Sequence, residues 1–155
     1  MTIVERLTGE TYDVEIIPIN VKDYNSITKS KFWFDWKKEK KFQVYKIQIK
    51  RTDEILGLIS IDILHNESRI EIRLLAVSIE NRGNTKKYTN IAGNLIAFAG
   101  IQSIKLFGDL ACISLVPKTE LVNHYKKEYL MQEAGRSLFL DGVELIQLII
   151  KYDYE

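Results

Sequence analysis

Three consecutive stretches in the first half of the chain alternate between hydrophobic and polar residues, as strands with one buried face do. They cover residues 42–50, 55–63 and 69–77, and short polar segments typical of turns separate them. The apolar face predicted for the second consists of Ile55, Gly57, Ile59, Ile61 and Ile63. The apolar face predicted for the third consists of Ile70, Ile72, Leu74 and Ala76. We expect these strands to form an antiparallel meander.

The segments before this meander are less regular. Residues 13–20 predict a first strand, and the proline within it favours a sheet edge or a strand end. Asn20 is a suitable N-cap for a short helix over residues 20–27. Residues 32–41 place aromatic side chains beside a run of charges, which predicts a second short helix or a surface loop.

The spacing of apolar residues changes to that of helices in the second half. Residues 87–105 predict the longest helix, and residues 110–116 form a nearly continuous apolar run typical of a strand buried on both faces. With the preceding strand these elements make a βαβ unit whose two strands we expect to be parallel. The remaining elements predicted are a helix over 120–129, a strand over 136–140 and a helix over 142–152.

Composition limits the class of protein. A chain of 155 residues with 46% hydrophobic and 28% charged residues fits one soluble domain, which we expect to cover residues 1–155. The formal net charge of +1 provides no overall excess of basic residues for nucleic-acid binding. The lone Cys112 makes a disulfide scaffold and a zinc module unfavourable, and we expect no metal. We expect no membrane span either, and a cytoplasmic location.

The order of these elements resembles the Gcn5-related N-acetyltransferase (GNAT) superfamily, most clearly over residues 73–129. The resemblance implies an α/β (α+β) fold: a mixed, mostly antiparallel sheet flanked by helices, with a βαβ unit that binds acyl-CoA. In that family the run that corresponds to Leu74–Val77 pairs its backbone with the pantetheine arm of acetyl-CoA. A glycine-rich turn and a helix N-terminus then hold the pyrophosphate, because free N–H groups and the helix dipole favour anions.

The family's Gln/Arg-x-x-Gly-x-Gly/Ala motif aligns with residues 87–92 when Leu95 and Ile96 serve as the anchor. Only the basic first residue and the small last residue match. Asn90 replaces the central glycine, and asparagine adopts the left-handed backbone conformation more readily than most residues. The resemblance implies that the cofactor contacts Leu75, Ala76, Val77, Lys86, Lys87, Tyr88, Asn90, Ile91 and Ala92.

The same resemblance implies two catalytic residues. Tyr125 aligns with a tyrosine that protonates the departing thiolate, although a packed core tyrosine has the same pattern. Glu71 lies near the position of a carboxylate that accepts a proton from the amine. Because Glu71 stands between Arg69 and Arg73, a cross-strand ion pair is the alternative. His124 is expected to point away from Tyr125, since neighbours on a helix do not share a face.

The aromatic cluster of Phe32, Trp33 and Trp36 has three interpretations. It forms one side of the acceptor pocket, it packs a short helix onto the sheet, or it forms a contact surface for another protein or a second copy of the chain. The spacing of the two tryptophans, three residues apart, would place them on one helical face.

The sequence therefore predicts an acetyl-CoA-dependent N-acetyltransferase acting on an unidentified amine or protein substrate. The alternative is a non-catalytic protein of the same fold that serves as an interaction or regulatory module, with a homodimer as one form. A nucleic-acid accessory role for residues 37–41 is disfavoured by the near-neutral charge.

Overall fold

The computed structural model describes residues 1–153, built around a sheet of nine strands in the order β6-β1-β2-β3-β4-β5-β7-β9-β8. Neighbouring strands pair antiparallel except β5 and β7, which are parallel. The strands are β1 Thr2–Glu5, β2 Thr11–Pro18, β3 Gln43–Ile49, β4 Ile55–Leu64, β5 Arg69–Val77, β6 Tyr88–Thr89, β7 Cys112–Leu115, β8 Gln132–Ala134 and β9 Ser137–Asp141. The mixed, mostly antiparallel sheet agrees with the predicted fold class.

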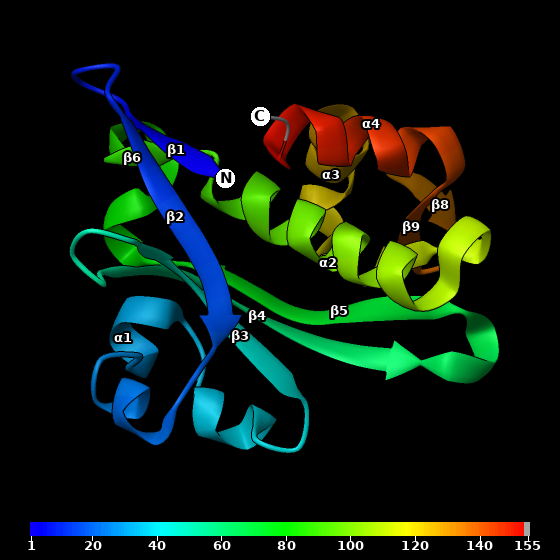
Figure 1. The fold of residues 1–155 in the computed structure, drawn as a ribbon, viewed down its shortest axis with the longest axis horizontal. Coiled ribbons are helices and arrows are strands. Elements are labelled where there is room, and N and C mark those ends of the chain that lie inside the picture. The colour runs from blue at the N-terminus through cyan, green and yellow to red at the C-terminus, as the bar shows by residue number, and fades with distance from the viewer. Residues whose placement is uncertain (154–155) are drawn as a thin grey trace.

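Helices cover both faces of this sheet (Figure 1). Three of them, α2 (Ile91–Phe107), α3 (Val122–Tyr129) and α4 (Gly142–Asp153), lie on one side. The other side carries α1 (Lys29–Phe32) and the short 3-10 helices η1 (Val21–Asn25) and η2 (Trp36–Glu39). Asn20 caps η1 as predicted: its side chain accepts the backbone N–H of Asp23, whose carboxylate accepts that of Asn20.

The predicted meander and βαβ unit are confirmed by the pairing of β3, β4, β5 and β7. The long helix, however, begins at Ile91 and not at Lys87. Tyr88 and Thr89 instead form β6, which pairs with β1 at the N-terminal edge of the sheet. The pattern predicted neither of these strands: β6 lies directly before the long helix in the chain, and β1 pairs with it from the N-terminus.

A bulge in β5 reverses the faces of this strand along its length. Ser60 pairs with Leu74 while the next residue, Ile61, pairs with Ile72, so Arg73 is an extra residue. Ile70 and Ile72 pack in the core beneath α2, but beyond the bulge Leu74 and Ala76 pack on the side of α1. The predicted single face of Ile70, Ile72, Leu74 and Ala76 is therefore wrong, because one inserted residue exchanges inside and outside.

Strands β3 and β4 are covered on both faces, whereas half-exposed strands were predicted. Ser60 is fully buried and donates to Glu39 of η2 at 3.0 Å. Lys46 is also buried, with its Nζ 2.9 Å from Asp23 Oδ1 of η1. The short helices η1 and η2 thus bring a carboxylate to each of these two buried polar side chains and satisfy its hydrogen bonding. The alternating pattern alone predicts that both side chains face solvent.

Residues 91–110 are long and apolar enough to span a membrane by length and composition, with a mean hydropathy of 1.3, which the sequence expectation did not anticipate. In the fold, 56% of this window is buried, because α2 packs between the sheet and α4. Gly100 permits this packing: an added Cβ would lie 2.9 Å from a methyl group of Leu145. Such burial is typical of the core helix of a globular protein.

Candidate functional site

The two parallel strands separate at the centre of the sheet. β7 ends at Leu115, which pairs with Ile72, whereas β5 continues to Val77. Beyond Val77, Ser78 donates its backbone N–H to β4. In an antiparallel strand, the backbone N–H and C=O groups of every second residue point to the same neighbouring strand. Since Ser78 bonds to β4, Leu75 and Val77 point their backbone groups the other way, into the gap beyond the end of β7.

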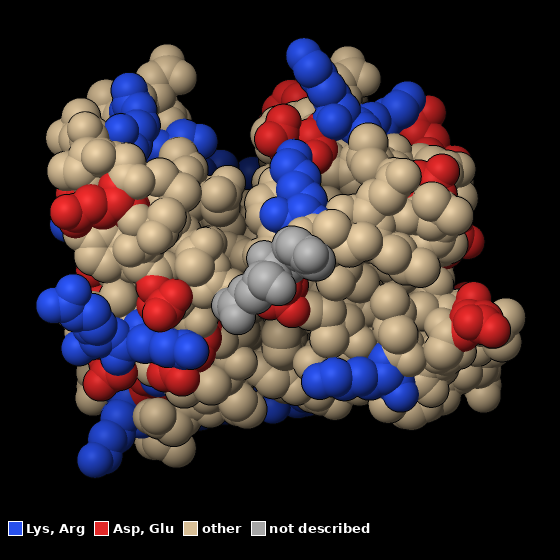
Figure 2. Space-filling view, turned by 45° about the horizontal axis from the view of Figure 1, so that its top comes forward, with Lys and Arg blue, Asp and Glu red and all other residues tan. Residues whose placement is uncertain are grey.

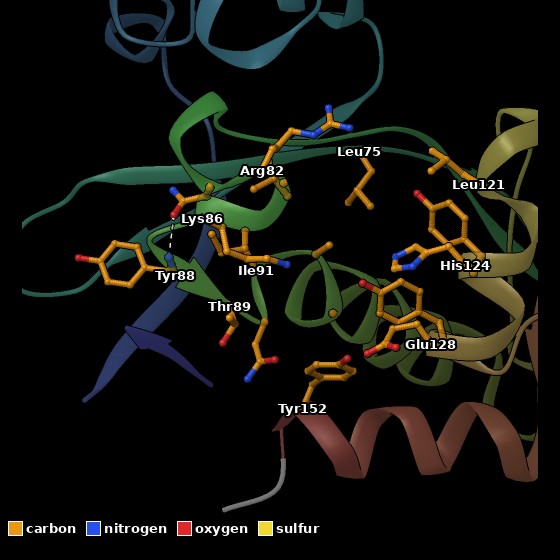
Figure 3. Close-up of a pocket in the computed structure, with 18 residues that line it drawn as sticks. Leu75, Arg82, Lys86, Tyr88, Thr89, Ile91, Leu121, His124, Glu128 and Tyr152 are labelled. Atoms are coloured by element: carbon orange, nitrogen blue, oxygen red, sulfur yellow. Dashed lines mark hydrogen bonds between the residues drawn. The ribbon is translucent and has the colours of Figure 1, made fainter. Parts of the chain in front are cut away.

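A cavity of about 460 Å³ opens at this point (Figure 3). In Figure 3 the start of α2 lies on one side, α3 lies opposite, and Tyr152 of α4 lies below. The lining residues from β5 and the loop after it are Leu75, Val77, Asn81, Arg82, Gly83 and Lys86. Those from β6 and the start of α2 are Tyr88, Thr89, Asn90, Ile91, Ala92 and Gly93. Those from α3, the turn before it and α4 are Leu121, His124, Tyr125, Glu128, Tyr129 and Tyr152.

The N-terminus of α2 points its first turn at this cavity. Asn90 is the N-cap residue and adopts a left-handed conformation (φ 74°). Asparagine thus takes the backbone conformation expected at this position, where the family motif has glycine. Its side chain makes no capping hydrogen bond. The next three residues, Ile91, Ala92 and Gly93, all line the cavity, and N–H groups in the first turn of a helix have no partner within the helix. This arrangement suits an anionic group.

Cationic side chains stand beside the same turn. Arg82 and Lys86 line the cavity from the loop between β5 and β6. Asn81 fixes this loop, since its side chain accepts the backbone N–H of Tyr88 at 2.9 Å and donates to Ser78 at 2.8 Å. Figure 2 shows a hollow between the surface formed by β1, β2 and β6 and that formed by α3 and α4, with Lys and Arg side chains beside it.

Trp33 connects this loop to the opposite face of the sheet. Its indole Nε1 donates to the carbonyl oxygen of Val77 at 2.9 Å, and the Arg82 guanidinium lies 4.5 Å from the centre of its ring. Lys31 of α1 also pairs with Glu80 at 3.5 Å. A stacked guanidinium loses little freedom when it binds an anion, so Trp33 helps to hold Arg82 in position.

Aromatic side chains form the wall opposite α2. The rings of His124, Tyr125 and Tyr129 lie within 5.8 Å of one another, centre to centre. Burial raises the pKa of the Tyr125 phenol, and the Arg82 guanidinium opposes part of that rise. Tyr125 is therefore protonated at neutral pH and can donate a proton. His124, expected to point elsewhere, lines the cavity as well, because a cavity this wide reaches two neighbouring helical positions.

Gly93 brings α4 to the same place. A Cβ atom at this position would lie 2.2 Å from the ring of Tyr152, so the tyrosine fits against α2 only because residue 93 has no side chain. The last turn of α4 thereby contributes Tyr152 to the cavity, next to the first turn of α2.

Seven of the nine residues expected to contact a cofactor line the cavity: Leu75, Val77, Lys86, Tyr88, Asn90, Ile91 and Ala92. Ala76 does not, because the bulge at Arg73 turns its side chain toward α1. Lys87 does not either: it is exposed before β6, and its Nζ lies 5.2 Å from the centre of the Tyr88 ring.

The bulge also separates the two expected catalytic residues. Glu71 precedes Arg73, so its side chain lies on the face opposite to that of Leu75 and Val77, and it does not line the cavity. The expected ion pairs of Glu71 with its arginine neighbours do not form among the described residues: Arg69 pairs with Glu67 at 3.1 Å and Arg73 with Glu39 at 3.0 Å. Tyr125 thus lies at the cavity and Glu71 lies across the sheet from it.

The aromatic cluster divides into core and surface. Phe32 and Trp36 are 0% and 1% exposed and pack against β3, β4 and β5. Trp33 is 40% exposed. The two tryptophans do not share a helical face, because α1 ends at Phe32 and Trp33 adopts a left-handed conformation. Packing therefore accounts for two of the three side chains, and Trp33 alone reaches the neighbourhood of the cavity.

Sequence reasoning missed Arg82 and Gly93 as cavity residues. The alignment anchored on Leu95 and Ile96 allowed no insertion and therefore selected Lys87 as the basic residue of the motif. The Arg82-Gly83 pair, five residues after Val77, was the available signal. Residues 84–90, which include β6, lie between that pair and the helix.

The sequence matches no protein-family profile and no curated protein. Solved structures with similar folds include the spermidine/spermine N-acetyltransferase SpeG from Vibrio cholerae, with 14% identity and a TM-score of 0.64 over 86% of this chain and 96% of that one. A complex of the Vibrio cholerae spermidine N-acetyltransferase with CoA and spermine has 13% identity and a TM-score of 0.62, over 86% and 98%. A Bacillus subtilis acetyltransferase in complex with CoA has 14% identity and a TM-score of 0.56, over 85% and 99%. The chain therefore has the GNAT fold, as the order of its elements predicted.

Proposed function

We propose that this protein is an N-acetyltransferase that moves an acetyl group from acetyl-CoA to an amine. Fold alone is a weak argument for activity. The observation that carries the proposal is the cavity itself, where a strand edge, a helix N-terminus, two cationic side chains and a protonated tyrosine meet.

The residues present fit acetyl-CoA. The N–H groups of Ile91, Ala92 and Gly93 would hold the pyrophosphate, and Arg82 and Lys86 would add charge-assisted hydrogen bonds. The pantetheine arm would lie along Leu75 and Val77, whose backbone groups face the gap between β5 and β7. This assignment keeps the acyl end of the cosubstrate near the sheet centre.

Two residues would move protons in the reaction. The amine nitrogen forms a bond to the thioester carbonyl carbon, and the C–S bond then breaks. Tyr125 gives its phenolic proton to the departing thiolate and regains one from solvent. Glu71, on the α1 side of the sheet, would accept the proton that the amine loses. The acceptor would then approach from the side of Trp33, opposite the cosubstrate.

The neighbours named above act on polyamines or bind CoA, and the acceptor of this protein is assigned only as an amine. An acyl-CoA cosubstrate and a single free cysteine both suit the cytoplasm, where we place the protein. The alternative, a non-catalytic interaction module, predicts that the cavity does not bind CoA.

Calorimetric titration with acetyl-CoA and with desulfo-CoA separates these two functions. Micromolar affinity for both compounds is the expected result. No heat of binding for either compound up to millimolar concentration would contradict the enzyme proposal and favour the interaction module.

Substitutions of Asn90 test whether the start of α2 binds the pyrophosphate, because one of them should change ligand affinity and thermal stability in different directions. Asn90→Asp should weaken acetyl-CoA binding by roughly 3–10-fold, because a carboxylate would face the phosphates. The same change should keep or raise the melting temperature, since an acidic N-cap stabilises a helix. Asn90→Gly should preserve affinity, because glycine adopts φ 74° without strain. Unchanged affinity in the aspartate variant would move the pyrophosphate elsewhere.

Arg82 and Lys87 form a matched pair for calorimetry. Arg82→Gln should reduce acetyl-CoA affinity by about 10-fold, the effect of losing one hydrogen bond to a charged group. Lys87→Gln removes the same charge outside the cavity and should change affinity by less than about 2-fold at physiological salt. Equal losses in both variants would indicate a general electrostatic effect and not a contact by Arg82.

A further inference from the structure

Tyr152, in the last turn of α4, lines the cavity but has no part in the reaction proposed above. Its side chain extends from α4 toward the first turn of α2 (Figure 3). A phenol in a cavity that suits an anion is a further hydrogen-bond donor for that anion, provided that its hydroxyl lies within reach and keeps its proton. The structure meets both conditions.

The contact with Gly93 fixes where this hydroxyl lies. A Cβ atom on Gly93 would lie 2.2 Å from two carbon atoms of the Tyr152 ring and 2.7 Å from its hydroxyl oxygen. Every Cα–Cβ bond of an α-helix leans toward the N-terminus of the helix. The hydroxyl oxygen of Tyr152 therefore lies beside the first turn of α2, on the side to which the free N–H groups of that turn point.

The ring of Tyr152 is held in this position by its neighbours. Besides the contact with Gly93, its centre lies 6.4 Å from the centre of the Tyr129 ring and 5.3 Å from the Nζ atom of Lys151. A donor that is already fixed in place loses little freedom when a ligand binds to it. The position of Tyr152 thus favours a hydrogen bond to a bound anion.

The phenolic proton of Tyr152 is available to a ligand. Burial raises the pKa of the phenol, Lys151 opposes part of this rise, and the charge of Glu128 adds to it. The hydroxyl is therefore protonated at neutral pH. Lys151 can only donate hydrogen bonds, so it leaves the phenolic proton free. Glu128 lines the same cavity but is exposed, so solvent screens its repulsion of an anion.

We propose that the Tyr152 hydroxyl donates a hydrogen bond to the pyrophosphate of the cosubstrate, beside the N–H groups of α2. This assignment rests on the proposed function, because it needs acetyl-CoA in the cavity. Figure 3 shows Arg82 and Lys86 above the start of α2 and Tyr152 below it, so that the pyrophosphate would have donors on both sides. Glycine is needed at position 93 because a side chain there would displace Tyr152.

Calorimetric titration of the full chain with acetyl-CoA tests this contact. Tyr152→Phe should lower the affinity by about 10-fold, the effect of losing one hydrogen bond to a charged group. The matched control is Tyr24→Phe, which removes the same hydroxyl from η1 on the other side of the sheet and should keep the parent affinity. Parent affinity in Tyr152→Phe would overturn this proposal and leave the proposed function intact. A parent chain that does not bind acetyl-CoA would overturn both.

A truncated cosubstrate shows which part of acetyl-CoA the hydroxyl contacts. S-acetylpantetheine ends before the pyrophosphate, so the parent chain and Tyr152→Phe should bind it equally, as measured by its displacement of acetyl-CoA. An equal loss of affinity for both compounds would indicate a change in the shape of the cavity. That result would overturn the contact with the pyrophosphate.

Tyr152→Ala tests whether the tyrosine binds the pyrophosphate or blocks it. This variant should weaken acetyl-CoA binding at least as much as Tyr152→Phe, because it removes the same donor. Tighter binding would mean that Tyr152 occupies space that the pyrophosphate needs, and would overturn the proposal. Thermal unfolding verifies that each variant is folded.

Discussion

Replacing Tyr125 with phenylalanine should lower turnover with acetyl-CoA and an amine acceptor by roughly 10²–10⁴-fold, the usual contribution of general acid catalysis. The phenylalanine ring keeps the packing against Tyr129, whose ring centre lies 5.7 Å away. Acetyl-CoA affinity and the melting temperature should therefore stay unchanged. Steady-state kinetics, calorimetry and thermal unfolding measure the three quantities separately.

The pH dependence of the same variant gives a second test. Burial raises the pKa of Tyr125, so its acid form persists through neutral pH and is lost only as pH rises above the ordinary range of tyrosine. The parent rate should fall along this alkaline limb, and the limb should be absent in the phenylalanine variant. The control variant is Tyr129→Phe, on the same helix. It should keep both the parent rate and its fall at alkaline pH. Parent rates in Tyr125→Phe would remove Tyr125 from the mechanism.

Trp36→Ala should reduce the free energy of unfolding by about 3–5 kcal/mol, the usual cost of removing a large aromatic side chain from a core. Its indole is 1% exposed and donates to the carbonyl oxygen of Phe32 at 3.0 Å. Such a loss is a large part of the ~5–15 kcal/mol by which most domains are stable. Equilibrium denaturation in urea gives the value.

Trp33→Ala serves as the comparison, because Trp33 is 40% exposed and should cost roughly 1 kcal/mol or less. If Trp36→Ala kept the stability of the parent protein and raised the KM for the acceptor, Trp36 would belong to the acceptor pocket. A stability loss without such an effect would assign it to the core, as its burial indicates.

Hydrophobic periodicity was sufficient for the elements that carry a long, regular pattern. β5 and α4 were predicted to within one residue of their observed ends, and the parallel pairing of β5 with β7 followed from the intervening helix. α4 forms because its own side chains repeat with the period of a helix, and β5 alternates as a strand does, although the bulge at Arg73 exchanges its faces. Tyr125 was singled out by the family resemblance, and periodicity placed it on the inner face of an amphipathic helix, one turn from its end.

The remaining errors come from features that leave no periodic signal. β6 contains only Tyr88 and Thr89 and forms because β1 lies beside it, so its existence depends on residues more than 80 positions away. Alternation in β5 continues through Arg73 in the sequence, yet the ladder does not. Both features depend on pairing partners, which the pattern within one segment does not specify.

The extra residue at position 73 makes the spacing of the chain, more than the identity of its residues, decisive for the wall of the cavity. If Arg73 paired with β4 as an ordinary residue of the ladder, alternation would be unbroken, and Leu75 and Val77 would face α1 while Leu74 and Ala76 faced α2. A substitution in β5 changes one side chain, whereas loss of the bulge at constant length would exchange the face of every side chain after it. Natural variants of this protein should therefore tolerate changes of residue type in β5 and keep either the bulge or a strand one residue shorter without it, since both place Leu75 and Val77 beside the cavity.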